Sequence, residues 1–143
     1  MGPTALSTFG IKVLSDSEKL KVGDITLQLI HSPGHTEESS CFLLLDSNNK
    51  QTCLFTGDTI FLNEVGRPDL AVKTDLTVRD LGSMLYDSIQ KIKKLDDEIR
   101  IYPGHGAGSS CGKAIGKGDF CTLGTQKQNN YALKANNKEN FIN

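Results

Sequence analysis

Three short apolar segments of this sequence end in the same way, and this repetition constrains the fold more than any other feature. An apolar run of four to six residues that stops at a glycine is typical of a buried strand, and glycine permits a tight turn after it. Each turn here delivers a side chain that can bind a metal, and strand-end loops are where a rigid scaffold presents such groups. The three are residues 25–30 before Ser32-Pro33-Gly34-His35, residues 52–55 before Thr56-Gly57-Asp58, and residues 99–102 before Pro103-Gly104-His105.

The side chains delivered by these turns form a candidate metal site of His35, Asp58 and His105. The third histidine, His31, lies at the end of its strand, before the turn, and we expect it to be a bystander. Imidazole with carboxylate suits zinc or non-haem iron, and two histidines with one carboxylate are the pattern of iron(II) oxygenases. A complete site needs further ligands from elsewhere.

The rest of the pattern predicts an α+β domain with short strands followed by helices. A hairpin is expected around Gly23-Asp24, because two strand-like runs flank this dipeptide. Leu81, Leu85, Ile89 and Ile92 recur at helical spacing and predict one buried helix face. The remaining expectations are a first strand at Phe9–Leu14, a strand at Cys41–Leu45, helices over 78–95 and 125–134, one partial domain over 1–135, and a polar, solvated C-terminal tail over 136–143.

Length and charge limit the class of protein. A chain of 143 residues, 37% of them hydrophobic, is enough for one compact domain. The net charge of −1 does not suggest a nucleic-acid partner, and no apolar run approaches the roughly 18 residues that a membrane span needs. The four cysteines form no CxxC pair, which favours a reducing compartment, mitochondrial or cytoplasmic. The first arginine is Arg67, which argues against an intact Arg-rich presequence.

The glycine-rich segment 106–113 admits other interpretations. It follows a strand as a phosphate-binding loop would, but Ala107 and Ala114 occupy positions where that loop needs glycine and a hydroxyl, which disfavours nucleotide binding. Cys111 with His105 could form a nucleophile pair, although no other feature of the sequence activates the thiol. Lys113 is either a solvated loop lysine or a contact for an anionic group of a substrate.

Four segments in order resemble the metal motifs and neighbouring loops of the metallo-β-lactamase superfamily. Within it they are most similar to the persulfide dioxygenases, especially the type that carries an appended rhodanese domain. The resemblance runs from about Gly2 to Leu133, and its third and fourth segments favour that family over glyoxalase II. The four segments are Ser32–Thr36, Phe55–Thr59, Gly66–Leu70 and Tyr102–Ser109.

The resemblance implies an αββα sandwich, of which this chain would be the C-terminal half, with strand-end loops that hold one iron(II). His35 and Asp58 match metal ligands, with zinc as the alternative metal, and His105 matches a catalytic histidine beside the iron. Arg67 and Lys113 are candidates for binding substrate. The reaction implied is the oxidation of glutathione persulfide, or a similar persulfide, to sulfite.

The family also has an N-terminal His-x-His-x-Asp-His motif, which has no counterpart among the three histidines of this chain. Three hypotheses follow. In the first, a second polypeptide supplies the missing half and the pair is a persulfide dioxygenase. In the second, the chain is an inactive structural subunit of a larger, possibly mitochondrial, complex. In the third, the complete protein is a glyoxalase II-like thioester hydrolase. Half a sandwich should leave apolar sheet surface without its cover.

Overall fold

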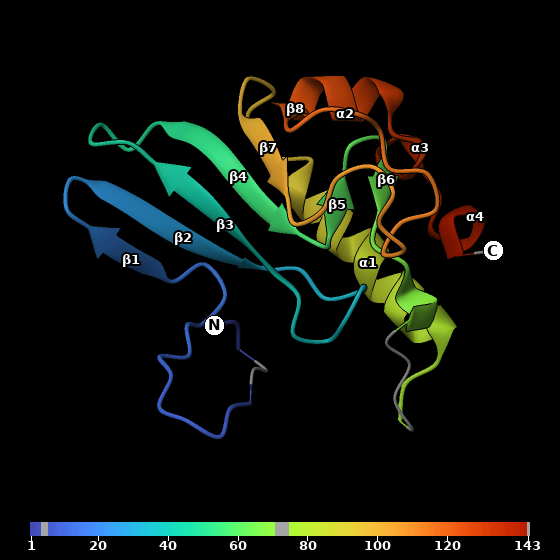
Figure 1. Cartoon of the computed structure of the whole chain (residues 1–143), viewed down its shortest axis with the longest axis horizontal. Coiled ribbons are helices and arrows are strands. Elements are labelled where there is room, and N and C mark those ends of the chain that lie inside the picture. The colour runs from blue at the N-terminus through green and yellow to red at the C-terminus, as the bar shows by residue number, and fades with distance from the viewer. Residues whose placement is uncertain (4–5, 71–74, 143) are drawn as a thin grey trace.

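The computed structural model describes residues 1–3, 6–70 and 75–142, and one mixed six-stranded sheet dominates it (Figure 1). The strand order is β1-β2-β3-β4-β7-β8. The first four strands form an antiparallel meander, β4 and β7 pair in parallel, and β8 is antiparallel to β7. A separate two-stranded sheet contains β5 and β6. The bounds are β1 Lys19–Val22, β2 Ile25–His31, β3 Ser40–Leu45, β4 Gln51–Gly57, β5 Ile60–Phe61, β6 Glu64–Val65, β7 Arg100–Pro103 and β8 Cys121–Thr122.

Helix α1 (Val78–Ile92) lies in the crossover between the parallel strands β4 and β7. It begins at Thr77, whose hydroxyl accepts a hydrogen bond from the Asp80 backbone while the Asp80 carboxylate accepts one from the Thr77 backbone. This reciprocal capping box satisfies backbone donors that a helix start leaves free. The other helices are a 3-10 turn η1 (Pro68–Leu70), α2 (Leu123–Asn129), α3 (Tyr131–Lys134) and α4 (Lys138–Ile142). No helix within the described residues has the length and apolar character to cross a membrane.

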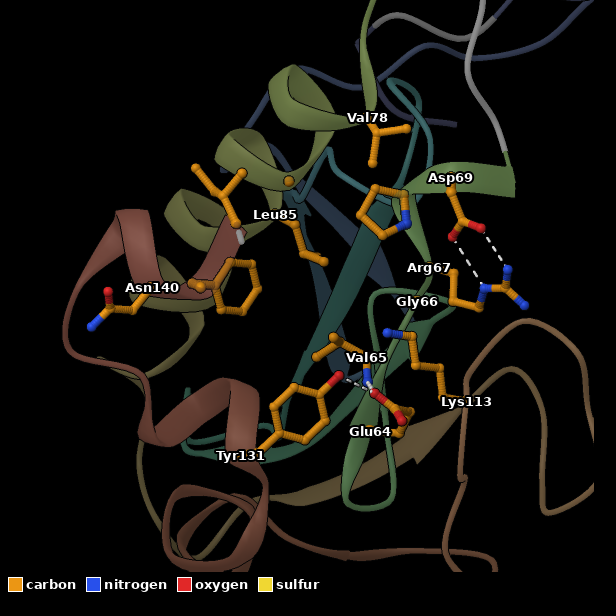
Figure 2. A pocket seen from close by; sticks show the side chains of 14 residues that line it. Glu64, Val65, Gly66, Arg67, Asp69, Val78, Leu85, Lys113, Tyr131 and Asn140 are labelled. Atoms are coloured by element: carbon orange, nitrogen blue, oxygen red, sulfur yellow. Dashed lines mark hydrogen bonds and ion pairs between the residues drawn. The ribbon is translucent and has the colours of Figure 1, made fainter.

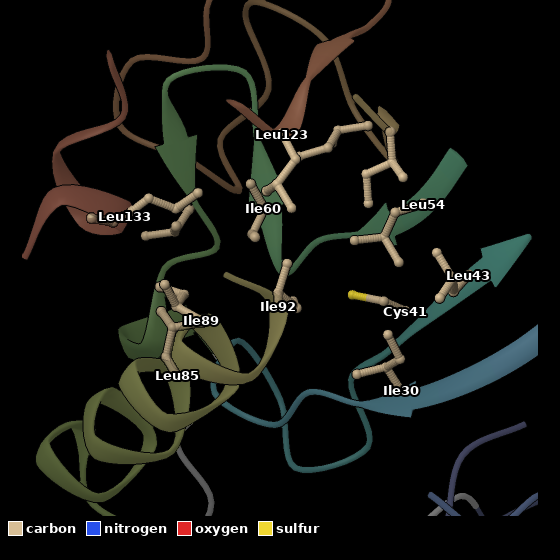
Figure 3. Close-up of a cluster of buried hydrophobic side chains, with 14 of the residues drawn as sticks. Ile30, Cys41, Leu43, Leu54, Ile60, Leu85, Ile89, Ile92, Leu123 and Leu133 are labelled. Atoms are coloured by element: carbon tan, nitrogen blue, oxygen red, sulfur yellow. The ribbon is translucent and has the colours of Figure 1, made fainter. Parts of the chain in front are cut away.

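The hydrophobic core lies between α1 and one face of the sheet (Figure 3). The apolar stripe predicted for the helix supplies Leu85, Ile89 and Ile92, each at most 1% exposed. Strands β2, β3, β4 and β7 contribute alternate residues to the same cluster, since successive side chains of a strand point to opposite faces. These are Ile30, Cys41, Leu43, Leu45, Leu54 and Ile101.

The opposite face of the sheet carries an aromatic row that the described residues leave partly uncovered. The row consists of Phe42, Phe55, Tyr102 and Phe120. Phe42 pairs with Phe55 and Phe55 with Tyr102 across neighbouring strands, and the ring centroids of Tyr102 and Phe120 lie 5.5 Å apart. Phe55 is 42% exposed and Phe120 is 50% exposed. Two of its four aromatic rings are therefore exposed on this face of the sheet.

Most of the predicted elements are present, including the hairpin at Gly23-Asp24 and the strand at Cys41–Leu45. The prediction of a strand at Phe9–Leu14 was wrong. The backbone of this segment makes hydrogen bonds to Met1 at Lys12 and Leu14 instead of pairing with a neighbouring strand.

The C-terminal region differs in two ways from the prediction. In place of the single helix expected over 125–134 there are two helices, α2 and α3. They are separated by Asn130, whose backbone is extended. The Asn130 amide group donates to the Glu64 backbone carbonyl, 3.0 Å away, so a tertiary contact overrides the helical pattern. The segment expected to be a solvated tail contains α4, where Phe141 packs edge-on against Tyr86 of α1 with ring centroids 5.5 Å apart.

Candidate metal centre

Parallel pairing of β4 with β7 places two of the predicted motif loops side by side. The two strands end at the same edge of the sheet, and the backbone N–H of Gly104 donates to the carbonyl of Gly57, 2.8 Å away. Asp58 and His105 are the next residue in each loop. The structure therefore brings together two side chains that lie 47 positions apart in the sequence.

The Asp58 carboxylate lies between two histidines. Its Oδ1 is 2.7 Å from Nδ1 of His105, and its Oδ2 is 3.7 Å from Nε2 of His35. The first distance brings the His105 ring and the Asp58 carboxylate into direct polar contact. The second pair is too far apart for a hydrogen bond. Oδ2 of Asp58 and Nε2 of His35 therefore both remain available as ligand atoms for a metal ion.

The orientation of His35 is fixed by a backbone carbonyl. Nδ1 of His35 lies 2.9 Å from the carbonyl oxygen of Arg67, which can only accept. Nδ1 therefore carries the proton, and Nε2 presents its lone pair toward Asp58. This is the arrangement by which proteins orient a metal-binding imidazole. The His35 side chain is 12% exposed and that of His105 is 46% exposed, so His35 is the inner histidine of the pair.

Gly104 makes the approach of the two loops possible. A β-carbon at this position would lie 2.7 Å from Oδ1 of Asp58 and 3.2 Å from the carbonyl carbon of Gly57. Any side chain would therefore displace the carboxylate or separate the loops. The glycine of the Pro-Gly-His sequence is thus required for steric reasons as well as for the turn.

Cys111 joins this cluster, which the sequence analysis missed. Donor atoms of His35, Asp58 and Cys111 all lie within 4.8 Å of one another. Nitrogen, carboxylate oxygen and thiolate sulfur are the three donor types that divalent zinc and related metals accept, so the residues present fit a metal ion. The only signal for this ligand in the sequence is that Cys111 lies in the loop that follows a metal motif.

Arg67 and Lys113 line a different cavity, of about 460 Å³, between α1, α4 and the loop around β6 (Figure 2). The Arg67 guanidinium makes two hydrogen bonds to Asp69, and these hold the pKa of the Asp69 carboxyl below its usual value. Lys113 reaches into the cavity between Arg67 and Glu64, and it has no ion pair among the described residues. Arg67 contacts the candidate metal site of His35, Asp58 and Cys111 through its backbone carbonyl, which binds His35, and not through its side chain.

A second cavity, of about 350 Å³, opens directly onto the metal cluster. It is lined by His35, Thr36, Ser39, Ser40, Gly57, Asp58 and Thr59. Neither Arg67 nor Lys113 is among these residues. His31 lies apart from the cluster, with Nε2 3.0 Å from the Glu37 carbonyl oxygen.

Comparison with known proteins shows several relatives that are longer than this chain, and no family model matches it. It is 39% identical over 98 residues to an uncharacterised protein of Mycobacterium tuberculosis, covering 68% of this chain and 41% of that protein. It is 34% identical over 106 residues to the probable polyketide biosynthesis zinc-dependent hydrolase PksB of Bacillus subtilis, covering 71% and 40%. It is 34% identical over 92 residues to hydroxyacylglutathione hydrolase of Francisella tularensis subsp. novicida, covering 64% and 32%.

Solved structures share the fold over most of this chain. A metallo-beta-lactamase from Staphylococcus aureus superposes with a TM-score of 0.82 at 40% identity, covering 92% of this chain and 38% of that one. ETHE1 from Myxococcus xanthus superposes with a TM-score of 0.74 at 25% identity, covering 99% and 54%. These neighbours confirm the predicted α+β class and the metallo-β-lactamase fold. The chain spans about a third to two fifths of the length of the curated relatives described above.

Proposed function

We propose that this chain, which its homologues and structural neighbours assign to the metallo-β-lactamase superfamily, is the C-terminal part of an iron-dependent persulfide dioxygenase. The substrate is glutathione persulfide or a similar low-molecular-weight persulfide, and the products are sulfite and the free thiol. The motifs at Gly66–Leu70 and Tyr102–Ser109, which resemble those of the persulfide dioxygenases, support this choice within the superfamily. A reducing compartment, mitochondrial or cytoplasmic, fits the four free cysteines.

The observation that carries the proposal is the convergence of the predicted motif residues. The Asp58 carboxylate lies 2.7 Å from Nδ1 of His105 and 3.7 Å from Nε2 of His35. Two histidines beside one carboxylate are the pattern of iron(II) oxygenase sites, which supports the dioxygenase within the superfamily.

His35 and Asp58 would hold the iron from this chain. Iron(II), when bound, supplies the activation of oxygen that the protein cannot perform itself. The Arg67 carbonyl keeps the His35 ring in the orientation that exposes Nε2, and His105 lies against the Asp58 carboxylate. The cavity beside them, at Thr36 and Ser39, gives the persulfide sulfur access to the site.

Lys113 and Arg67 would contact the thiol carrier rather than the sulfur, because they line the neighbouring cavity and not the one at the metal cluster. Glutathione carries two carboxylates, which suit cationic contacts. Lys113 makes no ion pair within 4 Å among the described residues; besides the Arg67 hydrogen bonds, its charge lowers the pKa of the Asp69 carboxyl from a longer distance, so the ammonium can still contact one carboxylate of the carrier. Arg67 is already paired with Asp69, and we assign it the weaker contact.

A second polypeptide would complete the domain on the aromatic row. The row exposes Phe55 and Phe120 on the sheet face opposite α1. The structural neighbours are about twice as long as this chain or longer, so each contains a part that these residues do not match. The remaining iron ligands would come from the polypeptide that covers this face.

Native material purified through a tag on this chain tests the proposed function. We expect about one iron per complex, oxygen consumption that depends on glutathione persulfide, and release of sulfite. Zinc in place of iron, with hydrolysis of a glutathione thioester, would favour the hydrolase. Material without metal and without either activity would identify the chain as a structural subunit.

A glyoxalase II-like thioester hydrolase is the second candidate. It is favoured by the 34% identity with hydroxyacylglutathione hydrolase over 92 residues and by the zinc-dependent hydrolase among the relatives. The same glutathione carrier would fit both reactions. The two candidates differ in the number of metal ions and in the role of His105.

His105→Ala separates the two candidates. In a one-metal site we expect the iron content of the complex to stay unchanged and turnover to fall by roughly 10- to 100-fold, because His105 acts through Asp58. Metal analysis and oxygen consumption are measured on the same sample, with His31→Ala as the control. Loss of a second equivalent of metal would contradict the one-metal site.

Phe55→Asp tests the role of the aromatic row. A charge in a buried apolar contact is unfavourable, so we expect the variant to lose most of its co-purifying polypeptide. Co-purification is quantified by mass spectrometry against Phe9→Asp. Phe9 is 71% exposed in the N-terminal segment and lies outside the row. Equal recovery of the second polypeptide with both variants would rule out the row as the interface.

A further inference from the structure

The loop that carries Cys111 is held against the metal cluster from two sides. The backbone N–H of Arg67 donates to the Cys111 carbonyl oxygen, 3.0 Å away, and the Cys111 N–H donates to Oγ of Ser109 at 3.2 Å. The next residue, Gly112, packs so closely that a β-carbon there would lie 2.8 Å from Cγ of Glu64. Arg67 is also the residue whose carbonyl orients His35. The thiol therefore has a defined place beside the inner histidine.

Cys111 differs from Cys41 and Cys121 in what its sulfur contacts. Cys41 is buried, which raises the pKa of its thiol, and its sulfur donates to the Thr56 carbonyl. The sulfur of Cys121 accepts from the Gln126 side chain at 3.1 Å. The Cys111 sulfur makes no hydrogen bond within the described residues, although the side chain is partly buried. The sulfur lies within 4.8 Å of a ring nitrogen of His35 and of a carboxylate oxygen of Asp58.

The spacing of the three donor atoms is close to that of a single coordination sphere. Zinc binds sulfur at about 2.3 Å and nitrogen or oxygen at about 2.0–2.2 Å, so donors of a tetrahedral site lie roughly 3.4–3.7 Å apart. The three atoms here lie within 4.8 Å of one another, and Oδ2 of Asp58 is 3.7 Å from Nε2 of His35. Small side-chain rotations would close the remaining gap to the sulfur.

We propose that Cys111 is a third metal ligand, which completes with His35 and Asp58 a set of three donors inside this chain. The thiol loses its proton when the metal binds, and the thiolate forms the sulfur–metal bond. A nitrogen, oxygen and sulfur set accepts zinc, cobalt(II) or iron(II), so it is compatible with both candidate functions. This ligand set includes His35 and Asp58, which also belong to the proposed function. It holds whether the reaction is persulfide oxidation or thioester hydrolysis. It means that the chain retains a divalent ion through its own side chains.

Cobalt(II) substitution tests the ligand directly. Native material, purified through a tag on this chain and stripped with a chelator, is titrated anaerobically with cobalt(II) under reducing conditions. We expect one cobalt per chain and an intense near-ultraviolet band from sulfur-to-cobalt charge transfer. In Cys111→Ser this band should disappear. Zinc affinity should also fall by at least roughly 100-fold. The reason is that loss of a residue that only hydrogen-bonds to a metal ligand already lowers affinity by about 10- to 100-fold.

Cys121→Ser is the matched control, because it removes another partly buried thiol that lies in β8 and contacts Gln126. It should keep both the band and the affinity, and circular dichroism should show that each variant is folded. A band that persists in Cys111→Ser, or wild-type material that binds no cobalt, would overturn the inference. Failure of the proposed function looks different: the material then lacks dioxygenase activity while the cobalt band remains.

Discussion

Asp58→Asn abolishes metal retention while the fold remains intact. The amide keeps the shape of the side chain, but it lacks the negative charge that a divalent metal needs. We expect metal affinity to fall by at least about 100-fold. Loss of a residue that only hydrogen-bonds to a metal ligand usually costs less than this. Metal content after gel filtration and the thermal transition are measured on the same preparation.

Asp69→Asn is the control for this variant. Asp69 lies eleven positions further along the chain and pairs with Arg67, but it is not one of the three clustered donors. It should keep the metal content of the wild type. Unchanged metal content in Asp58→Asn would contradict the assignment of this carboxylate as a ligand.

Gly66→Ala damages both the stability and the metal site. A β-carbon at Gly66 would lie 1.9 Å from the Asp58 carbonyl oxygen and 2.8 Å from Cβ of His35. The first contact is with backbone, which cannot rotate away, so β6 must move relative to both ligand residues. Overpacking of this kind costs about 3 kcal/mol, and the Tm should fall by roughly 10 °C.

Gly106→Ala provides the comparison for Gly66→Ala. A β-carbon at Gly106 would meet no atom within 4 Å, although the residue follows His105 directly. Its Tm and metal content should match those of the wild type. The measurements are differential scanning calorimetry and metal analysis. A Gly66→Ala protein with an unchanged Tm would show that β6 has more room than the structure gives it.

The strand ends and the three side chains that they deliver were predictable, because an apolar run followed by a glycine turn is a local pattern. The proximity of His105 to Asp58 needed one further fact, the parallel pairing of β4 with β7. That pairing depends on the α1 crossover, whose helical period was also visible in the sequence. Local pattern and one non-local pairing thus account for the centre of the site.

Features that depend on tertiary contact could not be predicted in the same way. Cys111 lies in a glycine-rich loop without periodicity, and tertiary contacts such as the hydrogen bond from Arg67 place it beside His35. The break at Asn130 arises from its contact with the Glu64 carbonyl. The separation of Lys113 from the metal cluster follows from two cavities that no sequence pattern describes.

The parallel pairing of β4 and β7 also sets an order of folding. Strands β1 to β4 form an antiparallel meander in which each strand pairs with the next along the chain, so we expect these short-range contacts to form first. The pairing of β4 with β7 must wait until the intervening segment, including α1, has closed a long loop. His105 reaches Asp58 only after this step. A partly folded chain that contains the meander alone has Asp58 without His105, so the complete cluster is a property of the fully folded chain.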